Sequence, residues 1–392
     1  MHILLANFTK MVNDSGGMAK VTCSFANEMV KRGHEVSLIY SDERSGEFYY
    51  PIDKKVKCYD LRFQNGKRIK FPLYLKIKRE FLRLFDKKKS RESRRAFSLK
   101  HYPAYCTQLL QEIQPDIIVS FNPGTSSMLL CVLDTKIPVI TMSHGDPADY
   151  FEFYPDTSVE AVRKSTINQV LLPSFAEHLK SHLPECKTVV IGNAIPQYVE
   201  SADLETDKDV YKIVFVGRLN HNHKRPHILI EAFAKIAAEF PNWVCELWGA
   251  QDSKAYYVRL KTLIKEKGLQ DRCFLKGTTK DVASVLRTGD IFAFPSAYEG
   301  FGMALGEGMS MGLPAVGFKS TTAVNEIIKD GETGILCDDG VDAFAKALYK
   351  LMNDNNLREI MGKNARLSMK EYAPEMIWNK WEFLLLETIR DR

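Results

Sequence analysis

The stretch HILLANFTKMVNDSGGMAKVTCSFANEMVKRGHEVSLIYS, residues 2–41, holds two short apolar segments on either side of a longer amphipathic one. Segment lengths and flanking residues predict a strand over 2–8, a loop over 9–18, a helix over 19–33 and a strand over 35–41. Gly33 stands where that helix should end, because glycine favours the left-handed backbone of a helix C-terminus. A strand, a helix and a second strand in this order are typical of a parallel sheet covered by helices.

The same alternation runs through most of the chain. Further short apolar segments predict strands over 115–121, 138–143, 169–174 and 187–193. After a polar, acidic segment at 198–211, a second series of strands is expected over 212–219, 242–250, 273–278, 291–296 and 314–319. We therefore predict two doubly wound α/β domains, over residues 1–198 and 199–373, followed by a helical tail at 374–392.

Length and composition fit a soluble globular protein. Of the 392 residues, 45% are hydrophobic and 26% are charged. No apolar run approaches the roughly 18 residues of a spanning helix, and the N-terminus lacks the basic flank and cleavage site of a secretory signal. The eight cysteines show no C-x-x-C spacing, which favours reduced thiols buried in the core of a cytoplasmic protein over disulfides or a zinc site.

A basic segment, residues 67–100, carries fourteen Lys or Arg against three acidic residues. Its apolar residues recur at helical spacing and its cations fall on other faces, which predicts a basic amphipathic helix suited to an anionic membrane surface. The residues expected at the membrane are Lys76, Lys78, Arg79, Phe81, Arg83 and Phe85. One alternative is a solvated helix whose apolar stripe packs on its own domain. Nucleic-acid binding is another, but no recognition motif accompanies the charge.

Several polar or glycine residues follow predicted strands, where ligands bind in doubly wound sheets. Gly16 and Gly17 precede a helix N-terminus that could receive a phosphate, although such a pair is more often an ordinary turn. Arg218 and Lys224 follow a strand and could clamp a diphosphate, or could simply be solvated.

Two glutamates lie in SAYEGFGMALGEGMSMGLP, residues 296–314. Glu299 falls in a turn after a strand, and Glu307 about two helical turns later, roughly 12 Å further along. Two carboxylates at that separation suit a nucleotide sugar, with one at the sugar and the other at the ribose. The alternative is a pair of exposed helix glutamates.

Together these motifs resemble family 4 of the retaining glycosyltransferases. The resemblance rests on GG at 16–17, GRL....K at 217–224, E-x7-E from Glu299 to Glu307, and NEIIKDGETGIL at 325–336. It implies the GT-B fold, in which two Rossmann-like domains face each other and the C-terminal helix, here about 374–392, crosses back to complete the first domain. It also implies a donor-binding second domain and an acceptor- and membrane-side first domain.

The resemblance also implies roles for individual residues. Arg218 and Lys224 are expected to hold the donor diphosphate, Glu299 to bind the donor sugar, and Glu307 to bind the ribose. His144, which alone would be a structural loop residue, matches the family's histidine near the transferred sugar. The other donor-binding residues implied are Gly16, Gly17, Gly217, Gly300, Phe301, Gly302 and Met303.

The expected activity is transfer of a hexose or N-acetylhexosamine from a nucleotide sugar to a lipid-linked or cell-envelope glycan, at the cytoplasmic face of the membrane. No cofactor or metal is expected. UDP is the preferred nucleotide, with GDP possible, because WGAQD at 248–252 and TTAVNE at 321–326 depart from the family's usual loops. Acceptor candidates are Asn122, Thr125 and Ser126. The alternatives are a nucleotide-sugar epimerase of the same fold and an inactive membrane-associated adaptor.

Overall fold

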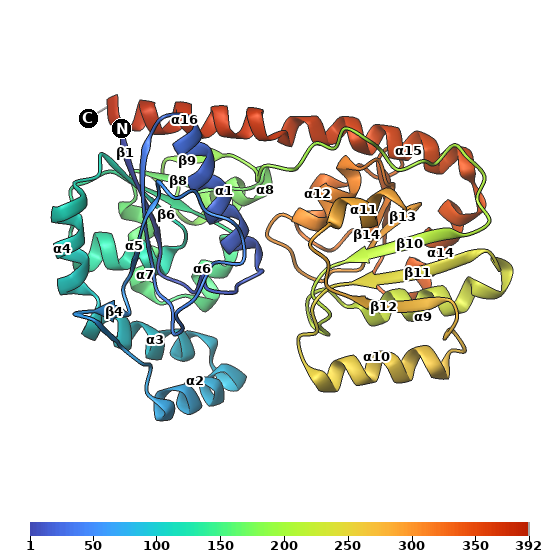
Figure 1. Ribbon diagram of the computed structural model, residues 1–392, viewed down its shortest axis with the longest axis horizontal. Helices are drawn as coiled ribbons and strands as arrows, with labels where there is room; N and C mark the ends of the chain where they lie inside the picture. The colour runs from blue at the N-terminus through green and yellow to red at the C-terminus, as the bar shows by residue number, and fades with distance from the viewer. Residues whose placement is uncertain (391–392) are drawn as a thin grey trace. The chain divides into compact units, whose positions relative to one another are not determined.

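The computed structural model describes residues 1–390 and divides into two compact units (Figure 1). Unit 1 comprises Met1–Gly192 and the chain from Trp378 onward, and unit 2 comprises Asn193–Ile377. The predicted division at 198 and 373 therefore lies a few residues from the division at 192 and 377. The side chains of residues 87, 88, 91, 93 and 94 lie outside the description.

Unit 1 is built on a seven-stranded parallel sheet in the order β3-β2-β1-β6-β7-β8-β9. The order reverses between β1 and β6, and ligands bind beyond the strand ends at such a switch point. The strands are β1 His2–Asn7, β2 Glu35–Tyr40, β3 Lys57–Asp60, β6 Ile117–Ser120, β7 Val139–Met142, β8 Ile167–Val170 and β9 Thr188–Val190.

Unit 2 is built on a six-stranded parallel sheet in the order β12-β11-β10-β13-β14-β15. Its switch point lies between β10 and β13. Its strands are β10 Tyr211–Val216, β11 Trp243–Trp248, β12 Cys273–Gly277, β13 Ile291–Phe294, β14 Ala315–Phe318 and β15 Gly334–Cys337.

Helices connect the strands of both sheets and cover their faces (Figure 1). In unit 1 they are α1 Gly17–Lys31, α2 Leu73–Phe85, α3 Lys87–His101, α4 Pro103–Ile113, α5 Pro123–Ser127, α6 Ala148–Phe153, α7 Asp156–Lys164 and α8 Pro173–His182. In unit 2 they are α9 Pro226–Ile236, α10 Lys254–Glu266, α11 Val282–Arg287, α12 Met303–Ser310, α13 Val324–Ile327, α14 Val341–Asn353 and α15 Asn355–Ser368.

The C-terminal helix α16, Pro374–Arg390, completes unit 1 from residue 378 onward, as the sequence led us to expect. The ring of Phe25 on α1 lies 5.5 Å from that of Trp378 and 4.9 Å from that of Trp381. Glu382 accepts hydrogen bonds from Arg32 at 2.6 Å and pairs with His34 at 2.9 Å. Aromatic packing and charged hydrogen bonds therefore fix α16 to the end of α1.

The sequence analysis missed or misplaced some elements. It did not predict β3, β15, or the small antiparallel hairpin of β4 Phe63–Gln64 and β5 Lys67–Arg68, and it placed β8 two residues too late. The basic segment was predicted as one helix, but it forms α2 and α3, because the Asp86 side chain accepts a hydrogen bond from the Lys89 backbone and caps a new helix. Cys58 was expected in the core and is exposed.

No helix of the described chain is long and apolar enough to cross a membrane.

The glycines of LGEGMSMG let α12 pack closely on its surroundings. A Cβ at Gly306 would come within 2.7 Å of Ile195, and one at Gly308 would come within 2.7 Å of the buried ring of Phe292 on β13. Real Cβ atoms do not approach other atoms so closely. The glycines therefore set the position of α12, which carries Glu307.

We predict that Gly308→Ala lowers the free energy of unfolding by about 1–3 kcal/mol, because the added methyl overpacks a core that cannot give way. The measurement is urea unfolding followed by circular dichroism.

Gly17→Ala is the matched control. A Cβ at Gly17, in the first turn of α1, would meet nothing within 4 Å. The same chemical change there should leave stability unchanged or raise it by up to about 1 kcal/mol. Equal stability of Gly308→Ala and the parent would mean that α12 does not depend on this close packing.

Candidate functional site

The switch point of unit 2 brings together a lysine and a glutamate from two strand-following loops. Lys224 follows β10 and Glu299 follows β13, and the lysine Nζ lies 2.5 Å from the Glu299 Oε1. Their side chains are only 22% and 9% exposed. Residues 75 positions apart thus form a partly buried ion pair at the edge where a doubly wound sheet binds ligands.

Two neighbouring residues hold Lys224 in place. The Asn220 side-chain oxygen accepts hydrogen bonds from the backbone N–H groups of His223 at 3.1 Å and Lys224 at 2.8 Å. The Lys224 ammonium also lies 4.8 Å from the centre of the Phe294 ring, within range of a cation–π interaction. Asn220 was not predicted from the sequence, although asparagine is among the residues whose side chains often bond the backbone of a turn.

Arg225 links the loop after β10 to the loop after β13. Its guanidinium donates to the carbonyl oxygens of Pro295 at 3.0 Å and Ser296 at 3.1 Å, directly after β13. Its own backbone has φ +46°, which is unusual for a residue other than glycine and is held here by the side-chain bonds. The sequence analysis did not predict this role.

Arg218 is exposed in the loop after β10. Among the residues that the structure describes, no carboxylate pairs with it within 4 Å. Its charge is therefore available to an anionic ligand, in contrast with that of Lys224, which Glu299 balances.

The turn that carries Glu299 leads directly into α12. Gly302 is the N-cap residue with φ +79°, so glycine is favoured at this position, and α12 begins at Met303. Phe301 is buried, with its ring 5.1 Å from that of Tyr372. The unpaired N–H groups of the first turn of α12, beside Gly300 and Glu299, form a favourable place for a phosphate or an oxygen-rich sugar.

Glu307 lies on α12 and is buried, with 5% of its surface exposed, and Glu299 is 8% exposed. The alternative of two exposed helix glutamates is therefore wrong. Burial, together with the negative charge of Glu307, raises the pKa of Tyr198.

The two loops that depart from the family pattern both take glycine-like backbone conformations. A Cβ at Gly249 would lie 1.9 Å from the Gly217 carbonyl oxygen, so WGAQD passes against the start of the loop that carries Arg218. Ala323 in TTAVNE has φ +74°, a value that normally favours glycine. The departures therefore change side chains near the site and leave the glycine-type turns in place.

The remaining predicted donor and catalytic residues belong to unit 1. Gly16 caps α1, and its N–H donates to the Asp14 side chain at 3.1 Å. His144 follows β7 and stacks on Phe121 at 5.7 Å. Burial lowers the pKa of His144 to about 4, so its imidazole is neutral at pH 7. Its buried Nε2 has no hydrogen-bond partner within the described residues.

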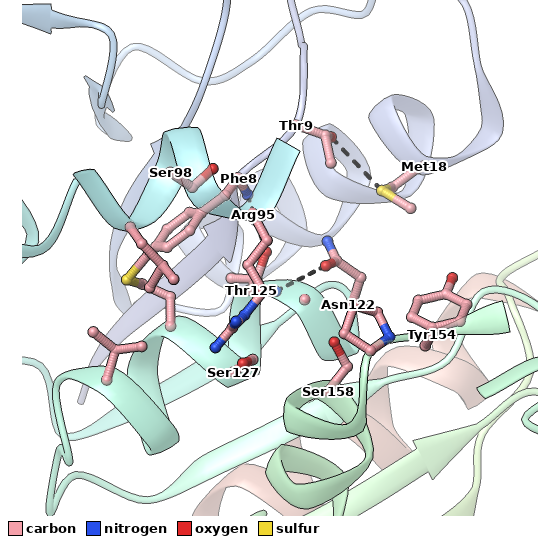
Figure 2. Close-up of a pocket in the computed structure, with 15 residues that line it drawn as sticks. Phe8, Thr9, Met18, Arg95, Ser98, Asn122, Thr125, Ser127, Tyr154 and Ser158 are labelled. Carbon is pink, nitrogen blue, oxygen red and sulfur yellow. Dashed lines mark hydrogen bonds between the residues drawn. The ribbon is translucent and has the colours of Figure 1, made fainter. Parts of the chain in front are cut away.

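Unit 1 also contains a pocket of about 290 Å³ at its own switch point (Figure 2). The acceptor candidates Asn122 and Thr125 line it. Ser126 does not. Its hydroxyl lies in the core, where it donates to Ser120 at 2.7 Å and bonds Thr141 at 2.7 Å.

The apolar stripe of α2 does not pack on its own domain, so that alternative is wrong. Its members are 63–77% exposed: Leu73, Tyr74, Ile77, Phe81, Leu84 and Phe85. The opposite side of α2 attaches to unit 1, because Lys76 bonds Glu43 at 2.6 Å and the Arg79 guanidinium lies 5.6 Å from the centre of the Phe71 ring. Of the cations predicted at the membrane, only Lys78 and Arg83 are exposed.

Among the described residues, no three His, Cys, Asp or Glu side chains come together in a group that could hold a metal ion.

Two family profiles match the chain one after the other. The family described as Glycosyltransferase Family 4 matches residues 15–197, and the family described as Glycosyl transferases group 1 matches residues 196–368.

Curated relatives match nearly the whole chain. An uncharacterized glycosyltransferase of Haemophilus influenzae is 23% identical over 96% of this chain and 98% of its own. A Campylobacter jejuni enzyme named as an alpha-1,4-N-acetyl-D-galactosaminyltransferase, acting on an undecaprenol-linked GalNAc-containing glycan, is 25% identical over 95% of this chain and 96% of its own.

Solved structures share the fold. Sucrose-phosphate synthase from Thermosynechococcus elongatus superposes with a TM-score of 0.77 at 16% identity and covers 100% of both chains. HepE from Anabaena, solved with UDP and glucose, gives a TM-score of 0.71 at 16% identity and covers 99% of this chain and 100% of its own. The architecture is therefore the GT-B fold.

Proposed function

Because the chain belongs to family 4 of the glycosyltransferases, we propose that it is a retaining, metal-independent enzyme that moves a hexose or N-acetylhexosamine from a UDP-sugar to a cell-envelope glycan. The observation that carries the proposal is the Lys224–Glu299 pair at the switch point of unit 2. The pair places a cation that can bind a diphosphate beside a carboxylate that can accept hydrogen bonds from sugar hydroxyls. The complex of HepE with UDP and glucose supports UDP as the nucleotide.

The donor binds with its diphosphate against Arg218 and Lys224 and with its sugar against Glu299. Lys224 exchanges its bond to Glu299 for one to the diphosphate. The N–H groups at the start of α12 face the phosphate or sugar oxygens. Glu307, further along the helix, receives the ribose hydroxyls.

Transfer breaks the bond between the sugar carbon and the diphosphate oxygen. The acceptor hydroxyl attacks the same face of the sugar, and its proton passes to the departing phosphate, so the anomeric configuration is kept. Negative charge develops on the leaving diphosphate, and Arg218 and Lys224 stabilise it. Loss of one such cation costs on the order of 2–4 kcal/mol of barrier.

His144 contributes as a neutral imidazole. Because burial holds its pKa at about 4, it cannot supply a positive charge at pH 7, but its ring nitrogens can still exchange hydrogen bonds.

A role in cell-envelope glycan assembly is supported by the names of several relatives. They include the Campylobacter enzyme with its undecaprenol-linked acceptor, an amylovoran biosynthesis enzyme and a capsular polysaccharide biosynthesis enzyme. We propose a lipid-linked or envelope glycan as the acceptor and the cytoplasmic face of the membrane as the place of reaction.

We predict that Lys224→Ala and Glu299→Ala each lower UDP release from UDP-sugars at least about 30-fold, because each removes an interaction with the reacting donor, on the scale of 2 kcal/mol or more. The assay uses UDP-glucose, UDP-galactose, UDP-GlcNAc and UDP-GalNAc with a panel of soluble glycosides as acceptors.

Lys235→Ala is the control. It removes an exposed lysine of the same unit, whose ion pair with Asp342 lies at the surface. It should keep the parent rate. Parent-like turnover by a folded Lys224→Ala or Glu299→Ala variant would refute the site. Conversion of the UDP-sugar to its epimer without an acceptor would instead identify an epimerase.

We propose that the exposed face of α2 binds an anionic membrane surface. Six large apolar side chains without cover on one helix are unusual for a soluble domain, and the same helix carries the exposed cations Lys78 and Arg83. Such a face buries its apolar residues among lipid headgroups while its cations attract the anionic lipids. The attachment through Lys76 and Arg79 holds the helix with that face outward.

We predict that the parent co-sediments with vesicles containing phosphatidylglycerol, less at high salt, and not with phosphatidylcholine alone. Lys78→Gln/Arg83→Gln should weaken binding at least about 10-fold and Phe81→Ser/Phe85→Ser should weaken it more, because each lysine or arginine near the surface adds about 1 kcal/mol and each buried phenylalanine about 1.5–3 kcal/mol. All four side chains are exposed, so the fold should be kept.

Lys54→Gln/Lys55→Gln removes the same charge from an exposed loop of unit 1 and should bind vesicles like the parent. Equal binding by the parent and both α2 variants, or no binding by the parent, would contradict the membrane proposal.

A further inference from the structure

We infer that the pocket at the switch point of unit 1 binds a sugar that carries an anionic group, a carboxylate or a phosphate, and that Arg95 recognises that group. The inference rests on the proposed function, because the sugar would belong to the acceptor.

The pocket is formed by the loops after two adjacent strands and by helices beside them, among them α3, α5 and α7. Phe8 and Thr9 follow β1, while Asn122 and Thr125 follow β6 and enter α5. Arg95, Ser98 and Leu99 come from α3, which lies along one side of the pocket (Figure 2). Unit 1 therefore has its own cavity where a doubly wound sheet normally takes a ligand.

Arg95 brings an unbalanced positive charge to this pocket. Figure 2 shows its guanidinium extending from α3 toward Ser127 on the opposite wall. Within the described part of the chain, no carboxylate pairs with Arg95 and no hydrogen bond from its guanidinium is found. A guanidinium that lines a pocket without an acidic neighbour offers two parallel N–H donors to a carboxylate or phosphate.

Two buried polar atoms in the same lining also lack partners. Ser127 is 2% exposed, yet its hydroxyl has no hydrogen-bond partner among the described residues. The same is true of the Asn122 side-chain nitrogen, although the Asn122 oxygen accepts a bond from the Thr125 backbone at 2.9 Å. Leaving such groups unsatisfied costs about 1–3 kcal/mol each, so they point to a polar ligand.

The rest of the lining suits the face of a sugar ring. Apolar side chains form much of it, including Met18, Met128 and Pro155, while Tyr154 and Ser158 add polar edges. The volume of about 290 Å³ lies at the small end of ligand pockets, which span roughly 300–1,000 Å³. A ligand with hydroxyls for Ser127 and Asn122 and one anionic group for Arg95 matches these features.

The test measures the affinity of four probes for the full-length protein by isothermal titration calorimetry: glucuronate, glucose 6-phosphate, methyl glucoside and inorganic phosphate. We expect one or both anionic sugars to bind at least 10-fold more tightly than methyl glucoside. Arg95→Gln should abolish that difference and Arg95→Lys should restore part of it. Ser127→Ala should weaken the binding of charged and neutral sugars alike.

Lys100→Gln is the matched control, since it removes a cation from the same helix at an exposed position outside the pocket and should keep the preference. The inference fails if methyl glucoside binds as tightly as both anionic sugars, if Arg95→Gln keeps the preference, or if inorganic phosphate binds as tightly as the preferred anionic sugar.

A UDP titration on the same samples separates this inference from the proposed function. Normal UDP binding without an anionic preference overturns the inference alone. An anionic preference that depends on Arg95, in a protein that does not bind UDP, supports the pocket and contradicts the proposed donor.

Discussion

The ion pair between Lys224 and Glu299 is the interaction on which the proposed chemistry depends. The Lys224 Nζ and the Glu299 Oε1 lie 2.5 Å apart in a partly buried site, so each charge has lost much of its water. Such a pair is stable only where neighbouring residues hold both side chains in position. Asn220 folds the lysine loop and Arg225 binds the strand end beside the glutamate turn. The Lys224–Glu299 pair is thus already organised, and in the proposed reaction a donor diphosphate would replace one anionic partner of Lys224 with another.

The two units share one arrangement of strands but carry different side chains where the strand order reverses. Each sheet reverses its order beside its first strand, and each reversal carries polar groups on the loops after the flanking strands. In unit 2 those groups are a cation and a carboxylate, suited to a nucleotide sugar. In unit 1 they are a pocket with Arg95 and two unsatisfied polar atoms. The basic segment carries both Arg95 and the exposed apolar face of α2.

Most strands and helices could be predicted from the sequence. The elements and site residues that could not be predicted were missed for physical reasons. Apolar strands such as 291–294 were predicted correctly, and Glu299 and Glu307 lie in the predicted turn and helix, because burial and spacing are local signals. The strand β3 was missed because it is short, polar and only half-buried at the sheet edge. Arg95 was not predicted as a site residue because it lies among many other Lys and Arg residues. The sequence alone does not say which of these side chains lines a pocket. Ser126 was wrongly predicted to face the ligand site. Neighbouring hydroxyl side chains on one short helix point in different directions, and the sequence does not say which of them faces the core.

The most direct test of the donor site is calorimetric titration of UDP into the parent, Lys224→Gln and Glu299→Gln. If the pair is the donor site, Lys224→Gln should lose at least about 10-fold in UDP affinity, equivalent to 1.4 kcal/mol. Glu299→Gln should bind bare UDP as tightly as the parent or more so, because the lysine no longer has a competing carboxylate. Parent-like affinity in Lys224→Gln, or a large loss in Glu299→Gln, would contradict this account.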